Sequence, residues 1–150
     1  MKHLYDPAVV AEVKGRVARL QPESARQWGR MTPAQAMAHC AAGLETATGE
    51  LSLPRVWFGR IFGRLAKRMA LSDDAPFGRN SPTAREFRIE GTRDLPQEQA
   101  RVQGLIDRFT AAGPAGCTTH PHAFFGPLTP EEWAVLMYKH LDHHLRQFGA

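Results

Sequence analysis

Two histidines one helical turn apart, His140 and His144, are the residues of this 150-residue chain best suited to chemistry. An ideal helix with about 100° per residue places both on the apolar side of their segment, in line with Trp133 and Met137. A buried polar group without a partner costs roughly 1–3 kcal/mol, so two imidazoles on one buried turn need a reason. Histidines four residues apart on one helix face can chelate a divalent metal. The alternative is a pair of core histidines bonded to backbone or carboxylate groups.

A metal site of this kind needs a third ligand, and three other histidines are candidates. His39 lies midway along a second helical segment, on a face whose small residues include Ala36 and Gly43. That face argues mildly against a position in the apolar core, but small residues let another helix approach closely. His120 and His122 belong to a loop before the segment that carries the pair. The residues alone leave the third ligand open.

Two neighbours of these histidines are less suited to the site. On the same ideal helix, His143 lies about 60° or more outside the apolar stripe, at a polar margin beside Lys139 and Gln147. Cys40 follows His39 directly and therefore points about 100° away from it. We expect neither residue to ligate the same metal.

Five segments repeat apolar residues with a period near 3.6 and are predicted to be helices. Two of them open with a capping box and a proline, at Thr32-Pro33 and Thr129-Pro130. No segment alternates over the length of a strand, and residues 87–89 are at most a short extended piece. The pattern predicts an all-α, antiparallel four-helix bundle with an additional helix in one long crossover. The expected helices span residues 6–20, 32–48, 54–71, 94–113 and 129–148.

Length and composition predict one globular domain over residues 1–150. The chain is 43% hydrophobic, which is enough for one core, and has no apolar run of about 20 residues that could cross a bilayer. Two cysteines are too few for a disulfide framework, and a charge and a proline lie in the first seven residues. We therefore expect reduced cysteines, a cytoplasmic location and no stable membrane insertion.

The net charge of +4 has a local origin in the third helical segment. Five basic residues lie there without an acidic one: Arg55, Arg60, Arg64, Lys67 and Arg68. A nucleic-acid-binding protein usually spreads basic residues over a whole contact face, so we expect no nucleic-acid partner. The segment is amphipathic, with Trp57, Ile61, Leu65 and Met69 at helical spacing. The simplest interpretation is a crossover helix packed on the bundle with a solvated basic face, and the alternative is an acidic membrane surface or partner.

His39 together with His140-x-x-His143-His144 resembles the histidine pattern of the DinB/YfiT-like superfamily of bacterial helical bundles. The stretches 27–40 and 124–148 resemble one branch of it whose activity is unknown, and the likeness extends over nearly the whole chain. The resemblance implies a four-helix bundle with a long crossover between the second and third core helices. It also implies a three-histidine metal site in which His39, His140 and His144 are the ligands and His143 is not.

Three imidazoles without a fourth protein ligand would leave an open site, as in catalytic metal centres. Imidazole suits zinc, nickel or iron, and related bundles include transferases and isomerases that use a low-molecular-weight thiol. We therefore expect a metal-dependent transferase or hydrolase acting on a small electrophilic molecule, and a homodimer is compatible with it. The alternatives are a non-catalytic metal-binding or stress-response bundle, and a partner- or membrane-binding protein that uses segment 54–71.

The loop at residues 115–128 leads directly into the histidine-bearing helix and is predicted to form part of the wall of the metal cleft. His122 would then be a catalytic group, able to transfer a proton near neutral pH. A histidine exposed on a surface loop is the alternative.

Overall fold

The computed structural model describes residues 1–79 and 88–150. Within them it is all-helical, as predicted, and the only extended pairing is an isolated bridge between His122 and Gly126. The short extended piece considered at 87–89 falls partly outside the described residues, and residues 88 and 89 lie in no strand. The helices are α1 (Pro7–Arg19), α2 (Pro33–Thr48), α3 (Trp57–Ala70), α4 (Leu95–Ala112), a 3₁₀ turn η2 (Pro114–Gly116) and α5 (Pro130–Gln147).

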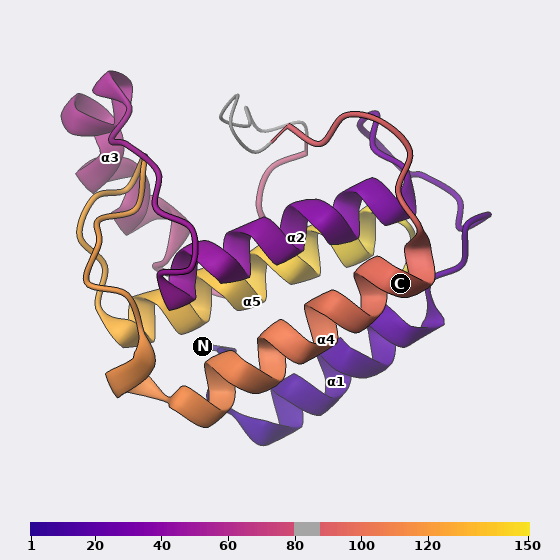
Figure 1. The fold of residues 1–150 in the computed structure, drawn as a ribbon. Coiled ribbons are helices and arrows are strands. Elements are labelled where there is room, and N and C mark those ends of the chain that lie inside the picture. The colour runs from indigo at the N-terminus through magenta and orange to yellow at the C-terminus, as the bar shows by residue number, and fades with distance from the viewer. Residues whose placement is uncertain (80–87) are drawn as a thin grey trace.

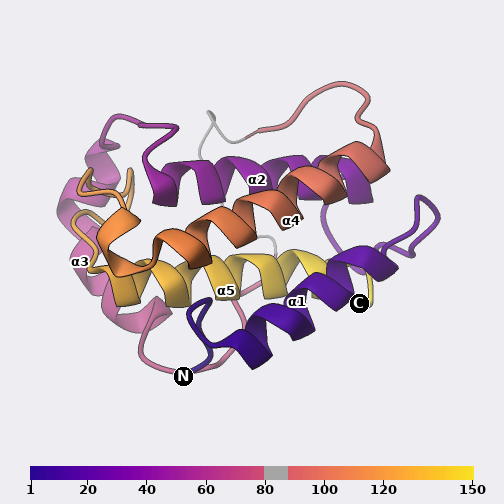
Figure 2. The ribbon, with the colours of Figure 1, turned by 60° about the horizontal axis from the view of Figure 1, so that its bottom comes forward.

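Four of these helices form the bundle, and α3 stands outside it (Figure 1). Helix α2 packs against α4 and α5, and α1 packs against the same two helices from the other side. The chain runs along the bundle in α1, returns in α2, crosses back through residues 49–94 and returns twice more in α4 and α5 (Figure 2). As a result α2 is parallel to α4 and antiparallel to α5. This is the four-helix bundle with a long crossover that the sequence predicts. The expected antiparallel arrangement holds for α2 and α5 but not for α2 and α4, because α4 starts at the end of the bundle where α2 starts.

The helix starts follow the capping signals in the sequence. The side chains of Thr32 and Thr129 each accept a hydrogen bond from the backbone N–H three residues on. In return, the side chains of Gln35 and Glu132 accept a hydrogen bond from the backbone N–H of the cap residue. These reciprocal bonds satisfy N–H groups that a helix terminus would otherwise leave without partners. The core between the four helices is apolar and includes Val13, Val17, Met37, Leu44, Leu105, Ile106, Phe109, Trp133, Leu141 and Leu145.

Helix α3 packs in a different way from the simplest interpretation of its sequence. Its buried residues are Gly59 and Gly63, which lie on the backbone of Phe124 in the loop before α5. A Cβ atom on either glycine would collide with the carbonyl oxygen of Phe124. The large apolar side chains of α3 therefore face solvent instead of the bundle. The expectation that they pack on the bundle was wrong, because the close backbone contact is made by the glycine face.

A buried lysine of α5 binds the crossover segment that follows α3. Lys139 is almost inaccessible, and its Nζ donates to the carbonyl oxygens of Ala70 and Asp73. The ammonium group also lies 5.2 Å from the centre of the Phe77 ring, at cation–π distance. These contacts hold residues 70–77 against the polar margin of α5, which is consequently covered.

On another side of α5, a buried carboxylate joins two arginines. Asp142 accepts from Arg16 of α1 at 2.7 Å and from Arg146 at 2.7 Å. Both Asp142 and Arg16 are buried, so the pair is shielded from water and links α1 to α5. Removing one partner of a buried ion pair leaves an unpaired buried charge, which is far more costly than the net value of the pair itself.

We therefore expect Asp142→Ala to lower the free energy of unfolding by about 3 kcal/mol, because it leaves the Arg16 guanidinium buried without its carboxylate. Urea denaturation followed by circular dichroism would measure the change. The matched control is Asp107→Ala, which removes an exposed carboxylate that pairs with Lys14 and should cost about 1 kcal/mol or less. Equal losses in the two variants would contradict this role of Asp142.

Candidate metal centre

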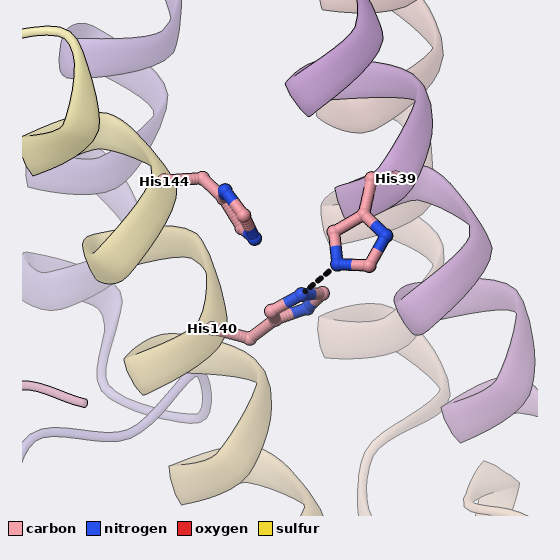
Figure 3. A group of neighbouring side chains, drawn as sticks. All are labelled: His39, His140 and His144. Carbon is pink, nitrogen blue, oxygen red and sulfur yellow. Dashed lines mark hydrogen bonds between the residues drawn. The ribbon is translucent and has the colours of Figure 1, made fainter. Parts of the chain in front are cut away.

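Helices α2 and α5 bring three histidines together in the interior of the bundle. Figure 3 shows His39 on α2 facing His140 and His144, which lie one turn apart on α5. The Nε2 atoms of His39 and His140 are 2.8 Å apart, at hydrogen-bond distance. The three ring centres are 4.7, 4.8 and 5.0 Å apart, and every pair of rings meets edge to face. We call these three residues the histidine triad.

The approach of the two helices depends on the small residues of α2. A Cβ atom at Gly43 would lie 2.9 Å from Nδ1 of His140, closer than real Cβ contacts allow. Gly43 therefore leaves the space that the His140 ring occupies. Ala36, one turn before His39, is fully buried and lets the helices stay close along this stretch. The small face that made the position of His39 ambiguous in the sequence is the face that meets α5.

The surroundings of His140 and His144 keep these two rings neutral. His39 and His144 are each 5% exposed, whereas His140 is half-buried. Burial, together with the neighbouring His39, lowers the pKa of His144 to about 3. Burial and the nearby imidazoles also hold the pKa of His140 well below its ordinary value. A neutral imidazole keeps a lone pair, which is the form that binds a metal.

One member of the triad has its orientation fixed by a hydrogen bond. Nδ1 of His144 lies 2.9 Å from Oε1 of Gln147, and the amide oxygen can only accept, so Nδ1 carries the proton. Nε2 of His144 is then the nitrogen with a free lone pair, and in Figure 3 it points toward the other two rings. Gln147 is itself held by a bond from its amide nitrogen to the carbonyl oxygen of Trp28. A hydrogen bond on the far nitrogen is the usual way in which ligand histidines are oriented.

The triad could hold a metal ion. One ring nitrogen from each histidine lies within 4.8 Å of the other two. Nitrogens bound at about 2.1 Å to a tetrahedral metal are roughly 3.4 Å apart, so small ring movements would bring the three into coordination. Among the described residues no carboxylate or thiolate joins this group, and a fourth position would be left for water or a small molecule.

His120, a candidate third ligand, and His143, which was not expected to bind the metal, both lie outside the triad. His120 is exposed, and its Nε2 lies 2.9 Å from the carbonyl oxygen of Leu53. His143 packs beside Trp28 and Phe77, and burial lowers its pKa. It is excluded from the triad's centre, as the helical wheel predicts. The polar margin on which it lies is covered by the crossover, which could not be inferred from α5 alone.

His122 organises the loop before α5. Its Nδ1 accepts hydrogen bonds from the backbone N–H groups of Phe124 and Phe125, each at 3.1 Å, and its ring contacts Trp133. Burial and the neighbouring Arg55 lower its pKa to about 4. These contacts favour a structural role, because Nδ1 is occupied and the ring stays neutral at pH 7. Proton transfer by His122 stays a prediction.

Cys40 is fully buried, and burial raises the pKa of its thiol. It is absent from the group of residues that could share a metal with His39, as its direction on the helix predicts. Cys40 and Cys117 are not joined to each other by a disulfide in the structure.

Comparison with known families gives one result. The sequence model of DUF1569, described as a protein of unknown function, matches residues 7–150. The chain belongs to the DUF1569 family. No curated protein and no solved structure matches it. Because the function of DUF1569 is unknown, membership of the family does not assign an activity to the chain. The wider likeness to DinB/YfiT-like proteins rests on the sequence motifs alone.

The first prediction for this site concerns the space at Gly43. Gly43→Ala should weaken Zn²⁺ binding at least tenfold, because the added methyl group displaces the His140 ring. Isothermal titration calorimetry would measure it. Gly104→Ala is the matched control, since Gly104 lies in α4 with open space around its Cβ position. That change should leave Zn²⁺ affinity unaltered and add about 0.5–1 kcal/mol of stability. Unchanged affinity in Gly43→Ala would contradict the role given to Gly43.

The second prediction concerns pH in metal-free protein. In the unfolded chain His122 and His144 take up protons near their ordinary pKa of 6.5, but in the folded chain they do so only near 4 and 3. Between those pH values the unfolded state binds more protons than the folded state. The contribution of these histidines to the free energy of unfolding is therefore fully present above pH 6.5 and falls as the pH drops toward 4. Each histidine contributes about 1.4 kcal/mol per pH unit in that window.

Urea denaturation at several pH values with a chelator present would measure this slope. His122→Gln should make the slope shallower by the contribution of one histidine, because glutamine does not titrate. A free energy of unfolding that is the same at pH 7 and pH 5 would show that the buried histidines are not held neutral.

Proposed function

We propose that the chain is a metal-dependent enzyme whose histidine triad binds one divalent cation. The observation that carries the proposal is the convergence of three imidazoles from two helices with no fourth protein ligand among the described residues. If His140 and His144 were core histidines bonded only to the backbone, there would be no need for Nε2 of His39 to lie 2.8 Å from Nε2 of His140. A site with three protein ligands and one open position is typical of catalytic rather than structural metals.

The residues around the triad support specific roles. His140 is the half-buried member, so the side of the triad at His140 is where a small molecule would enter. Gln147 fixes the His144 ring in a ligand orientation through its bond to Nδ1. Gly43 leaves room for His140, and the buried side chain of Met137 lies next to that space. A divalent cation held there would act as a Lewis acid, stabilising a thiolate or polarising a small electrophile.

We further propose an S-transferase, isomerase or hydrolase reaction on a small electrophilic substrate, with a low-molecular-weight thiol as the nucleophile. Neither cysteine of the chain suits that role, since burial raises the thiol pKa of both Cys40 and Cys117. A thiolate attack at this site would therefore need a thiol from outside the chain.

A second candidate is a non-catalytic metal-binding or stress-response protein. The observation that favours it is the burial of His39 and His144, since two of the three rings are almost closed to solvent. Such a protein would retain metal tightly without turning over a substrate.

Elemental analysis of protein purified without added metal tests the shared part of both proposals. We expect about one zinc, nickel or iron ion per chain. His39→Ala, His140→Ala and His144→Ala should each lose it, since each removes one of three ligands. His143→Ala is the matched control and should keep it, because its ring lies between Trp28 and Phe77. Retention of metal by His144→Ala, or its loss from His143→Ala, would contradict the site.

A panel of low-molecular-weight thiols with a model electrophile then separates enzyme from binder. Thiol consumption that needs the metal and disappears in His140→Ala would support the enzyme. A fully metal-loaded protein that does not accelerate any of these reactions would favour the non-catalytic candidate.

A further inference from the structure

Helix α3 exposes a continuous apolar surface that the bundle does not use. Within the described residues it carries all the exposed large hydrophobic side chains apart from Met1. They are between 53% and 70% exposed, although residues of these types are usually buried. We call this surface the α3 strip; its members are Trp57, Phe58, Ile61, Phe62, Leu65 and Met69.

The strip forms one side of a three-sided helix. With about 100° per residue, its six side chains cover roughly 140° of the circumference, and it is about 18 Å long. Gly59 and Gly63 form a second side, which is fixed on the backbone of Phe124. Rotating the strip toward the bundle would lift the glycines off this contact and place Cβ-bearing residues where only glycine fits. The strip is therefore held outward by the packing of α3, at the end of the bundle where Figures 1 and 2 place the helix.

The third side of α3 is basic. Lys67 of this side is paired with Glu132 of α5 at 2.9 Å, which ties the helix to the bundle. Arg60, Arg64 and Arg68 are exposed and bond to no described residue. On the ideal helix Arg60 and Arg64 lie next to the Trp57 edge of the strip, and Arg68 lies just inside that edge. No acidic residue occurs between Arg55 and Leu71, so three free cations flank the strip without a counter-charge on the helix.

We propose that α3 docks the protein on the surface of an anionic lipid bilayer, with the strip in the interface and the three arginines on lipid phosphates. An amphipathic helix with Trp, Phe and Leu on one side and Arg or Lys beside them is the arrangement that lies flat in the headgroup region. Long arginine side chains can reach the phosphates from the edge of such a helix. No helix of the described residues has the length and hydrophobicity to span a bilayer, so binding would be peripheral.

Charge disfavours a second copy of the chain as the occupant of the strip. Two α3 helices packed strip to strip would bring six arginines to one interface, and neither helix offers an acidic residue to pair with them. An anionic lipid surface supplies negative charge over the whole length of the helix. The triad lies on α2 and α5, so this docking does not depend on the metal.

Co-sedimentation of the full chain with vesicles tests the proposal. We expect binding to phosphatidylcholine vesicles that contain phosphatidylglycerol and little binding to phosphatidylcholine alone. Binding should weaken as salt shortens the Debye length from about 30 Å at 0.01 M to about 3 Å at 1 M. Arg60→Gln, Arg64→Gln and Arg68→Gln together should weaken it roughly 100-fold, since each cation near the surface contributes several-fold.

The matched control changes three exposed arginines outside α3, Arg19, Arg30 and Arg108, to Gln, which lowers the net charge equally. It should keep most of the binding. Ile61→Ser with Leu65→Ser should abolish binding even at low salt, and circular dichroism would verify that these exposed changes leave the bundle folded. Tryptophan emission should shift to shorter wavelength on vesicle addition. The shift should disappear in Trp57→Phe, because Trp133 is buried and Trp28 lies in the loop before α2, outside the strip.

Three results would overturn the proposal. They are absence of binding to anionic vesicles, equal loss of binding in the two arginine variants, and a dimer in sedimentation that Ile61→Ser with Leu65→Ser dissolves. The last would make the strip an interface between copies. Vesicle binding should also be measured with and without a chelator, and we expect the same result in both. A negative result for vesicle binding would then not contradict the metal centre, and a negative result for metal binding would not contradict docking.

Discussion

The structure depends on the close approach of α2 and α5 at the turn that contains Gly43. With no side chain at that position, the His140 ring fits between the helices and comes within hydrogen-bond distance of His39. His144 lies one turn further along α5, so the same contact also brings its ring to 4.8 Å from the His39 ring, on the side that faces α5. The site therefore arises from helix packing and does not require a long loop to fold over it.

The rest of α5 is organised around this contact. Its histidine face meets α2, Asp142 ties another side to α1 through Arg16, and Lys139 holds the crossover against the remaining surface. A helix that is buried on most sides can carry polar residues only where each has a partner. The long crossover is thus part of the packing of α5, and its Phe77 contacts the His143 ring, which also packs against Trp28 of the loop before α2.

Much of this could be predicted from the sequence because the signals are local. Capping boxes at Thr32 and Thr129 fix helix starts within a few residues, and the four-residue spacing of His140 and His144 puts both on one face. His39 could not be placed by such reasoning, since a helical wheel does not say which neighbour a small face meets. The burial of α3 was mispredicted because apolar side chains were taken to mark the packed side. Gly59 and Gly63, four residues apart and without a turn to explain them, are the signal that could have shown the true contact.

The central claim is that the three histidines form one metal site, and X-ray absorption at the zinc edge of the loaded protein tests it most directly. The structure predicts three imidazole nitrogens at about 2.0–2.1 Å from the metal, the same spectrum in His143→Ala, and no zinc bound in this way in His144→Ala. A sulfur ligand at about 2.3 Å, or a spectrum that His144→Ala does not alter, would contradict it.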